Sequence, residues 1–245
     1  IIHSPQLVHR LEEKGVRVVA HPDEISEQAV IVRSHGVTST EMAALAEKNV
    51  RVVDATCPFV KKAQEYAATL SEEGYHLIVV GEAEHPEVQG IVSYAEKGRV
   101  SVVAEAGQVA ALGRFSRLAL VAQTTQSFDN FRQIVEACLP LARELRVFNT
   151  ICNATSVRQK EARQIASQVE LMLVVGGYNS ANTTRLAQIC KDIQPRTYHV
   201  ETAEDLDPAW FQGVERIGIT AGASTPDWLI EQVVDRVTSL TGGAG

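Results

Sequence analysis

The sequence lacks the features that mark several common protein classes. It has four cysteines and 5% aromatic residues in 245, and no apolar run approaches the length of a membrane span. So few cysteines do not make a disulfide scaffold, which favours a reducing, cytoplasmic setting. No signal-peptide pattern opens the chain. Neither G-x-x-x-x-G-K-S/T nor G-x-G-x-x-G occurs, so the familiar nucleotide-binding folds are not supported.

An excess of positive charge is also missing. The formal net charge is −7 and no basic cluster stands out, which argues against a nucleic-acid or membrane-surface partner. What the chain does have is 45% hydrophobic residues, enough to bury a substantial core in one to three domains.

The chain contains an internal repeat of about 95 residues. Cys57 ends the run RVVDATC and Cys152 ends the similar run RVFNTIC. A polar loop lies further along each copy, after a helical stretch and an apolar run. The spacing from Cys57 to His85, in the first of these loops, equals the spacing from Cys152 to Ser180, in the second. Each copy closes with an apolar run that enters a Gly/Ser/Thr loop, LALVAQTTQS and IGITAGASTP. The repeat predicts modules of similar structure.

A partial third copy precedes these two. It consists of IIHSPQ, VRVVAHPDEI and AVIVRSHGVTS, and it begins at the second loop of the unit. When the cysteine-to-loop spacing of the other two copies is counted back from His3, the cysteine loop of this copy is expected upstream of Ile1. We expect a truncated module at 1–56, a second at 57–148 and a third at 149–245.

Apolar strand-like runs alternate with helical stretches along the chain. The runs AVIVRS, VRVVDA, HLIVVGE, VSVVAE, LALVAQ, LMLVVGG and RIGITAG lack polar alternation, as strands buried on both faces do. Helical stretches such as KKAQEYAATLSEE, FDNFRQIVEACLPLARELR, RQKEARQIASQVE and TTRLAQICKDI lie between them. This alternation predicts an α/β fold with mainly parallel sheets, whose strand-end loops form the binding crevice. Three such modules around a pseudo-threefold axis would gather these loops in one central pocket.

The four cysteines fall into two kinds. Cys138 and Cys190 lie in helical stretches and are expected to be buried structural thiols. Cys57 and Cys152 stand in strand-to-helix turns, where helix amides favour a thiolate. Their recurrence indicates a shared cofactor more than a lone nucleophile. Two core cysteines at equivalent positions, or a disulfide between them, remain alternatives.

Histidines and small polar residues gather in the same loops. His3, His35 and His85 occur in the sequences HSP, SHG and EHPE, next to turn-forming residues. The loops NSAN and GAS add hydroxyl and amide groups. Imidazoles, hydroxyls and helix-start amides together suit a phosphate or diphosphate.

Taken together, the motifs IIHSP, SHGV, DATCP, HPEVQG, QTT, ICNAT, NSAN and TAGASTPD resemble the 4-hydroxy-3-methylbut-2-enyl diphosphate reductases. These iron–sulfur enzymes close the methylerythritol phosphate route to isoprenoids. The resemblance runs through nearly the whole chain in the family's order. It implies three α/β modules around a [4Fe–4S] cluster, each supplying one cysteine, and a diphosphate substrate that is reductively dehydroxylated to isopentenyl or dimethylallyl diphosphate.

The resemblance also implies a role for each site residue. Cys57 and Cys152 match cluster ligands, and the third is expected upstream of Ile1. Glu87 and Thr124 match residues that relay protons, with His85 beside them. The residues that match the substrate-binding set are His3, His35, His85, Ser180, Asn182 and Ser224. Ala181 stands where the family often has a serine, so one hydroxyl contact to the diphosphate is missing.

The resemblance further implies a ferredoxin or flavodoxin as the electron donor. A non-catalytic diphosphate-binding relative, or a fragment that has lost its cluster, is the alternative. A zinc hydrolase that uses Cys57, Cys152 and His85 is disfavoured, because neither H-x-x-H nor C-x-x-C is present. The half-missing first module should leave strand edges exposed, so we expect this chain to behave poorly in solution.

Overall fold

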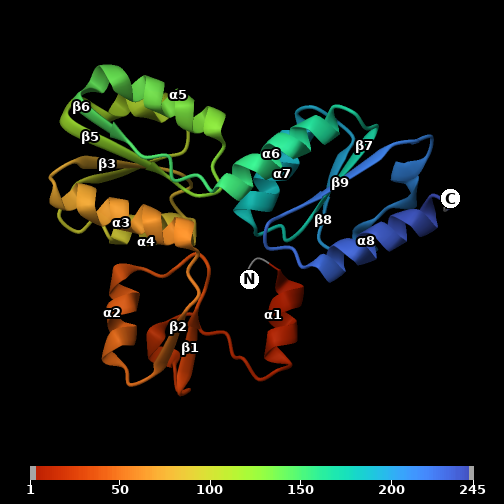
Figure 1. The fold of residues 1–245 in the computed structure, drawn as a ribbon, viewed down its shortest axis with the longest axis horizontal. Helices are drawn as coiled ribbons and strands as arrows, with labels where there is room; N and C mark the ends of the chain where they lie inside the picture. The colour runs from red at the N-terminus through yellow and green to blue at the C-terminus, as the bar shows by residue number, and fades with distance from the viewer. Residues whose placement is uncertain (1–3, 243–245) are drawn as a thin grey trace. The chain divides into compact units, whose positions relative to one another are not determined.

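The computed structural model describes residues 4–242 and has the predicted α/β architecture (Figure 1). Strands and helices alternate, and every strand pair is parallel. The strands are β1 (Ala29–Val32), β2 (Arg51–Asp54), β3 (His76–Val80), β4 (Val100–Val103), β5 (Phe115–Ala122), β6 (Ala142–Val147), β7 (Leu171–Val175), β8 (Thr197–Val200) and β9 (Ile217–Ala221).

The described residues also contain eight α-helices and five short 3₁₀ segments. The α-helices are α1 (Pro5–Glu12), α2 (Ser39–Glu47), α3 (Pro58–Glu72), α4 (Pro86–Ser93), α5 (Phe128–Cys138), α6 (Asn153–Ala166), α7 (Ala181–Lys191) and α8 (Asp227–Leu240). The 3₁₀ segments are η1 (Pro22–Glu24), η2 (Ala106–Leu112), η3 (Leu139–Leu141), η4 (Ala203–Asp205) and η5 (Pro208–Phe211).

The strands form three sheets, with the orders β1-β2, β4-β3-β5-β6 and β8-β7-β9. The second and third sheets share the same arrangement of their first three strands, which we call the frame. In the second sheet β3 lies between β4 and β5, and in the third sheet β7 lies between β8 and β9. The register of the strand ends is also the same in the two sheets. Val80 pairs with Val103 and Ala122, and Val175 pairs with Val200 and Ala221. The repeat seen in the sequence is therefore a repeat of structure.

Both larger sheets are covered by helices on their two faces, which explains their uninterrupted apolar strands. In the second sheet, α3 and α4 pack against the side chains of Leu77 and Val79, and α5 packs against those of Ile78 and Val80. In the third sheet, α8 covers one face, and α6 and α7 cover the other. With both faces buried, no alternation of polar and apolar residues survives.

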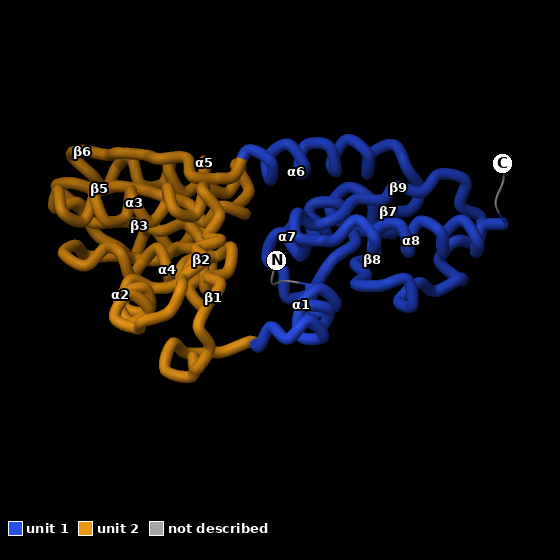
Figure 2. The backbone as a smooth tube through the Cα atoms, turned by 60° about the horizontal axis from the view of Figure 1, so that its bottom comes forward, with its two compact units in different colours: residues 1–17, 153–245 blue, residues 18–152 orange. Residues whose placement is uncertain are grey.

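The chain divides into two compact units (Figure 2). One unit is 18–152 and holds the first two sheets, and the other combines 1–17 with 153–245 and holds the third. Each of the three sheets falls inside one of the modules expected at 1–56, 57–148 and 149–245. The module boundaries and their pseudo-threefold arrangement stay predictions.

Within the described residues, the first module has the two strands β1 and β2. VRVVAHPDEI, the counterpart of the run that forms β4, contains no strand, and its regular structure is limited to the 3₁₀ segment η1. The reason is that β4 pairs with β3 alone, and no described residue of the first module forms a strand equivalent to β3. Ile31 and Val53, which are neighbours in register, are 58% and 43% exposed.

One helix prediction was wrong at its end. The stretch FDNFRQIVEACLPLARELR was expected to be helical throughout, yet α5 ends at Cys138 and β6 begins at Ala142. Pro140 lies in η3 between them, and a proline inside a helix removes a hydrogen bond and clashes with the preceding turn. The remaining residues instead pair with β5.

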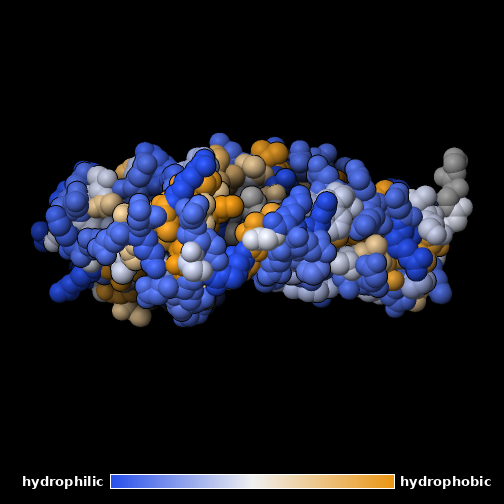
Figure 3. Space-filling view, turned by 90° about the horizontal axis from the view of Figure 1, so that it is seen from below, coloured by the Kyte–Doolittle hydropathy of each residue, from blue (hydrophilic) through white to orange (hydrophobic). Residues whose placement is uncertain are grey.

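The surface drawn in Figure 3 is mostly hydrophilic, and its hydrophobic residues are gathered in small patches. Across residues 4–242, no helix combines the length and the apolar character that a bilayer crossing needs.

Candidate functional site

The candidate residues lie in, or directly after, loops at the carboxyl ends of the parallel strands, as such sheets require. In the unit 18–152 these loops carry Cys57, Cys152, His35 and His85, and Glu87 follows as the second residue of α4. In the other unit, the loops after β7 and β9 carry Ser180 and Ser224, and Asn182 follows as the second residue of α7. His3 lies outside the described residues.

The two cysteine loops have the same local structure. Asp54 Oδ1 accepts the Thr56 N–H at 3.0 Å, and Asn149 Oδ1 accepts the Ile151 N–H at 3.2 Å. In both loops, therefore, the side chain three residues before the cysteine stabilises the turn by a hydrogen bond to the backbone. The Cys57 N–H then donates to Ser34 O, and the Cys152 N–H donates to Thr124 O, both at 2.9 Å.

Each cysteine directly precedes a helix. Cys57 is the N-cap of α3, with Pro58 in the first turn, and Cys152 stands one residue before α6. Both are partly exposed, whereas Cys138 and Cys190 are fully buried, as predicted. Burial raises the pKa of the Cys138 and Cys190 thiols to about 11. Cys57 and Cys152 are therefore the two accessible thiols among the described residues.

His85 caps the helix that carries Glu87. Its Nδ1 accepts the Glu87 backbone N–H at 3.1 Å, so the neutral ring holds its proton on Nε2. Burial lowers the pKa of His85, while Glu82 opposes this and Arg33 adds to it. The ring is thus held neutral, with one nitrogen bonded to the helix and the other able to donate.

His35 lies next to His85. The two ring centroids are 5.5 Å apart and the rings are nearly perpendicular, at 88°. His35 is 8% exposed, although it stands in a loop after β1. The structure therefore brings together two of the histidines that the sequence singled out, from loops that are far apart in the chain.

Glu87 is buried and bonded to Thr124. The carboxylate accepts the Thr124 backbone N–H at 2.6 Å and the Thr124 hydroxyl at 2.9 Å. Burial raises the pKa of Glu87 to about 7, and the two bonds from Thr124 oppose that rise. A carboxyl group with this pKa can hold or release a proton at neutral pH.

The candidate residues in and after the loops that follow β7 and β9 have neutral hydroxyl or amide side chains. Ser180 is the N-cap of α7, and its hydroxyl oxygen accepts the Thr183 N–H at 3.3 Å. Asn182 is 8% exposed, and its Nδ2 has no hydrogen-bond partner. Ser224 is partly exposed in the loop after β9. A helix start with a buried, unpartnered donor suits an anion.

Sequence reasoning missed two buried residues beside these loops. Gln123 precedes Thr124, is 1% exposed, and accepts the Glu82 N–H with Oε1 at 3.1 Å. Thr183 is fully buried, and a methyl group on Gly222 would collide with its hydroxyl. Thr183 is aligned with Val88 of the preceding repeat, so a polar residue at an apolar repeat position was the available signal.

The described residues supply only some of the ligands that a metal centre would need. No three His, Cys, Asp or Glu side chains within 4–242 lie close enough together to hold a metal ion. A four-iron cluster needs at least three protein ligands, and Cys57 and Cys152 supply two thiols. The described residues therefore do not complete the ligand set of such a cluster.

Comparison with protein families places nearly the whole chain in one group. Residues 1–238 match the family described as LytB protein. A protein of Syntrophotalea carbinolica named 4-hydroxy-3-methylbut-2-enyl diphosphate reductase is 58% identical over 241 residues, which are 98% of this chain and 86% of that protein. A protein of Geobacter metallireducens with the same name is 58% identical over 240 residues, 98% of this chain and 85% of that protein.

Solved structures agree with these relatives. A structure titled as the E-1-hydroxy-2-methyl-but-2-enyl-4-diphosphate reductase from Plasmodium falciparum superposes with a TM-score of 0.90 at 27% identity, covering 97% of this chain and 76% of the other. Another, titled as (E)-4-hydroxy-3-methyl-but-2-enyl diphosphate reductase, the terminal enzyme of the non-mevalonate pathway, has a TM-score of 0.69 at 45% identity, covering 98% and 86%. The resemblance drawn from the loop motifs is confirmed.

Proposed function

Because this chain belongs to the LytB protein family, we propose that it is an oxidoreductase that acts on 4-hydroxy-3-methylbut-2-enyl diphosphate. The reaction is a reductive dehydroxylation, the last step of the methylerythritol phosphate pathway. Two electrons and two protons are consumed, the hydroxyl leaves as water, and isopentenyl or dimethylallyl diphosphate is formed.

The observation that carries this function is the buried pair of Glu87 and Thr124. The reaction needs an acid that is protonated near neutral pH in a place from which water is excluded. Glu87 meets both needs, because it is 2% exposed and its pKa is raised to about 7. We assign the proton supply to Glu87, with the Thr124 hydroxyl as the group that passes the proton between the carboxyl and the substrate oxygen.

The remaining polar residues are proposed to bind the two ends of the substrate. The Nε2–H of His85 and the adjacent His35 are assigned to its oxygen atoms, with His3 as a further member of the set. Ser180, Asn182 and Ser224 are assigned to the diphosphate. The N-terminus of α7 favours negative charge, and Asn182 Nδ2 is a buried donor that a phosphate oxygen would satisfy.

A [4Fe–4S] cluster is proposed as the cofactor, with Cys57 and Cys152 as two of its ligands. The ligand set among the described residues is incomplete, so the proposal requires one more thiolate. Cys138 and Cys190 do not qualify, because both are enclosed by the hydrophobic clusters under their helices. The electrons are proposed to come from a small ferredoxin or flavodoxin, and the location is proposed to be cytoplasmic.

Iron and acid-labile sulfide per chain, measured after anaerobic reconstitution, test this proposal together with turnover. The chain is compared with a form that carries an N-terminal extension from a relative, including the cysteine expected upstream of Ile1. Turnover is followed as oxidation of reduced methyl viologen by 4-hydroxy-3-methylbut-2-enyl diphosphate. We expect about four iron and four sulfide in the extended form, with turnover, and far less in this chain.

Two other results would change the assignment. Full loading of both forms would mean that a group other than a third cysteine completes the cluster. An extended form that binds no iron and oxidises no viologen would overturn the reductase function. A diphosphate-binding protein without a cluster would then be the better description, which the incomplete ligand set already favours as the second candidate.

A further inference from the structure

The Cys57 and Cys152 loops are joined to the neighbouring strand by different groups. Two residues before Cys57, the backbone N–H of Ala55 donates at 3.0 Å to Val32 O, the carbonyl of the last residue of β1. The matching position in the other loop is Thr150, two residues before Cys152. There a side-chain hydroxyl makes the link to the last residue of β5.

The Thr150 hydroxyl bonds both backbone groups of one buried residue. Its oxygen accepts the Ala122 N–H at 2.8 Å, and the hydroxyl donates its own proton to Ala122 O. Ala122 is fully buried and Thr150 is 5% exposed. Because an unpaired N–H or C=O group in such a place costs free energy, this one hydroxyl satisfies two groups that need a partner.

These bonds fall between two backbone bonds along the same edge of β5. Leu120 O accepts the Phe148 N–H and Thr124 O accepts the Cys152 N–H, both at 2.9 Å. β6 itself ends before these donors. The Thr150 hydroxyl therefore continues the attachment of the chain to β5 beyond the end of β6, as far as the cysteine.

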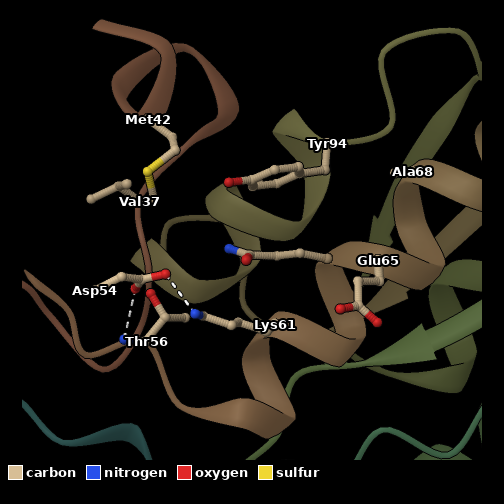
Figure 4. Close-up of a pocket in the computed structure, with 9 residues that line it drawn as sticks. Val37, Met42, Asp54, Thr56, Lys61, Glu65, Ala68 and Tyr94 are labelled. Carbon is tan, nitrogen blue, oxygen red and sulfur yellow. Dashed lines mark hydrogen bonds and ion pairs between the residues drawn. The ribbon is translucent and has the colours of Figure 1, made fainter. Parts of the chain in front are cut away.

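An ion pair supports the first loop instead. Asp54, whose side chain stabilises the turn, is paired with Lys61 of α3 at 2.6 Å beside a cavity of about 310 Å³ (Figure 4). The repeat has Asn149 and Ser156 at these two positions, and neither side chain carries a charge. The attachment of the second loop thus depends on the Thr150 hydroxyl and the backbone bonds on either side of it.

This attachment lies directly beside the proposed proton path. Ala122 is two residues before Thr124, whose N–H and hydroxyl are bonded to Glu87. Cys152, a proposed cluster ligand, is two residues after Thr150. A movement of the loop away from β5 would therefore shift the cysteine relative to the Glu87–Thr124 pair.

We propose that Thr150 is a positioning residue: its hydroxyl bonds both backbone groups of Ala122 and so fixes Cys152 against the end of β5, beside Thr124. This inference rests on the proposed function of Cys152, Glu87 and Thr124. Thr150 itself lies outside the motifs that carry the family resemblance.

The first test is alkylation of Cys152 in Thr150→Val, with Cys57 of the same chain as the internal reference. Valine has nearly the shape of threonine but no hydroxyl, so both groups of Ala122 lose their partner. We expect iodoacetamide to modify Cys152 about threefold faster or more relative to Cys57, because the released loop opens to solvent. Peptide mass spectrometry of the chain before reconstitution measures this ratio. Thr150→Ser, which keeps the hydroxyl, should restore the ratio of the unaltered chain.

A destabilising control separates positioning from a general loss of stability. Thr150→Val should also lower the melting temperature, because two buried groups are left unpaired. Ile134→Val removes one methyl group from the buried face of α5 in the same unit, and it should lower the melting temperature as well. The ratio of Cys152 to Cys57 alkylation should nevertheless stay unchanged in Ile134→Val.

Two further readouts follow the loop and the reaction. Amide hydrogen exchange in Thr150→Val should quicken in peptides that cover 120–126 and 148–153 and stay unchanged in 52–58. In the extended, reconstituted enzyme, kcat should fall about tenfold or more in Thr150→Val, with KM nearly unchanged. Thr150→Ser and Ile134→Val should keep kcat within about twofold of the unaltered enzyme.

An unchanged alkylation ratio in Thr150→Val would overturn the positioning role. So would an equal rise in Ile134→Val, a Thr150→Ser variant as impaired as Thr150→Val, or a normal kcat in Thr150→Val. If the unaltered extended enzyme has no reductase activity, the proposed function fails, and the alkylation and exchange results still decide whether Thr150 holds the second loop.

Discussion

The loops that follow β3 and β5 can be compared residue by residue with those that follow β7 and β9. Gly81 and Gly176 donate their N–H groups to the last residue of the neighbouring strand, at 3.0 and 2.9 Å. His85 and Ser180 are then the N-caps of α4 and α7, each donating its own N–H to the carbonyl three residues earlier. The backbone frame is the same in the two places.

The side chains on this frame differ in kind. Glu87 and Asn182 both occupy the second position of their helices, yet Glu87 is a titratable acid bonded to Thr124 and Asn182 is a neutral amide with an unpartnered Nδ2. The duplicated frame thus carries chemically different side chains in its two copies. Under the proposed function, one copy serves proton transfer and the other holds the diphosphate.

The largest effect is expected from placing the residue of the second frame in the first. Glu87→Asn removes the acid and puts in its place a neutral amide on a side chain that is one methylene shorter. If Glu87 supplies the proton, kcat should fall about 100-fold or more, while KM changes little. Steady-state kinetics of the extended, reconstituted enzyme measure this. Near-normal turnover in Glu87→Asn, or in the closer Glu87→Gln, would remove Glu87 from the proton path.

Ionisation of the Glu87 carboxyl group should make the free energy of unfolding depend on pH. The pKa of Glu87 is about 7 in the folded chain and about 4.5 when exposed, so the folded state keeps a proton that the unfolded state loses between these pH values. The free energy of unfolding should therefore fall as pH rises from 4.5 to 7, by about 3 kcal/mol in total.

Glu87→Gln lacks this titration and is the matched variant. The free energy of unfolding of Glu87→Gln minus that of the unaltered chain should be about 3 kcal/mol larger at pH 8 than at pH 4.5. Urea unfolding of both proteins at the two pH values measures this difference. An equal difference at the two pH values would show that the carboxyl group is not held neutral by burial.

Asn182→Ala tests the anion-holding frame. A hydrogen bond to a charged oxygen contributes about 1.5–3 kcal/mol, so KM should rise about tenfold or more, with kcat within about threefold. The melting temperature should not fall, because Asn182 Nδ2 has no partner to lose in the absence of substrate. Gln188→Ala, on the exposed side of α7, is the control. A large fall in kcat instead would move Asn182 into the proton-transfer frame.

Much of this frame could be read from the sequence, because the signals are local. Uninterrupted apolar runs marked the strands that are buried on both faces, and the cysteine-to-loop spacing marked their equivalence. Neither signal depends on a partner far away in the chain. The helix expected through β6 failed because a single proline outweighed an otherwise helical pattern.

The features that could not be predicted from the sequence depend on contacts with residues far away in the chain. VRVVAHPDEI resembles the run that forms β4, but it forms no strand, because pairing and not composition makes an edge strand. Glu87 was identified by resemblance, whereas its bond to Thr124 and its raised pKa follow from burial.

The smallest expected effect concerns Ala181, the first residue of α7. Its counterpart in the first frame is Pro86, and neither residue offers a hydroxyl group. Ala181→Ser adds a hydroxyl beside the helix amides that are proposed to bind the diphosphate, so KM should fall about two- to fivefold, with kcat unchanged. Initial rates at low substrate concentration resolve a change of this size. Pro86→Ser, which adds the same group to the proton-transfer frame, should not lower KM; if it did, the two frames would not divide their tasks in this way.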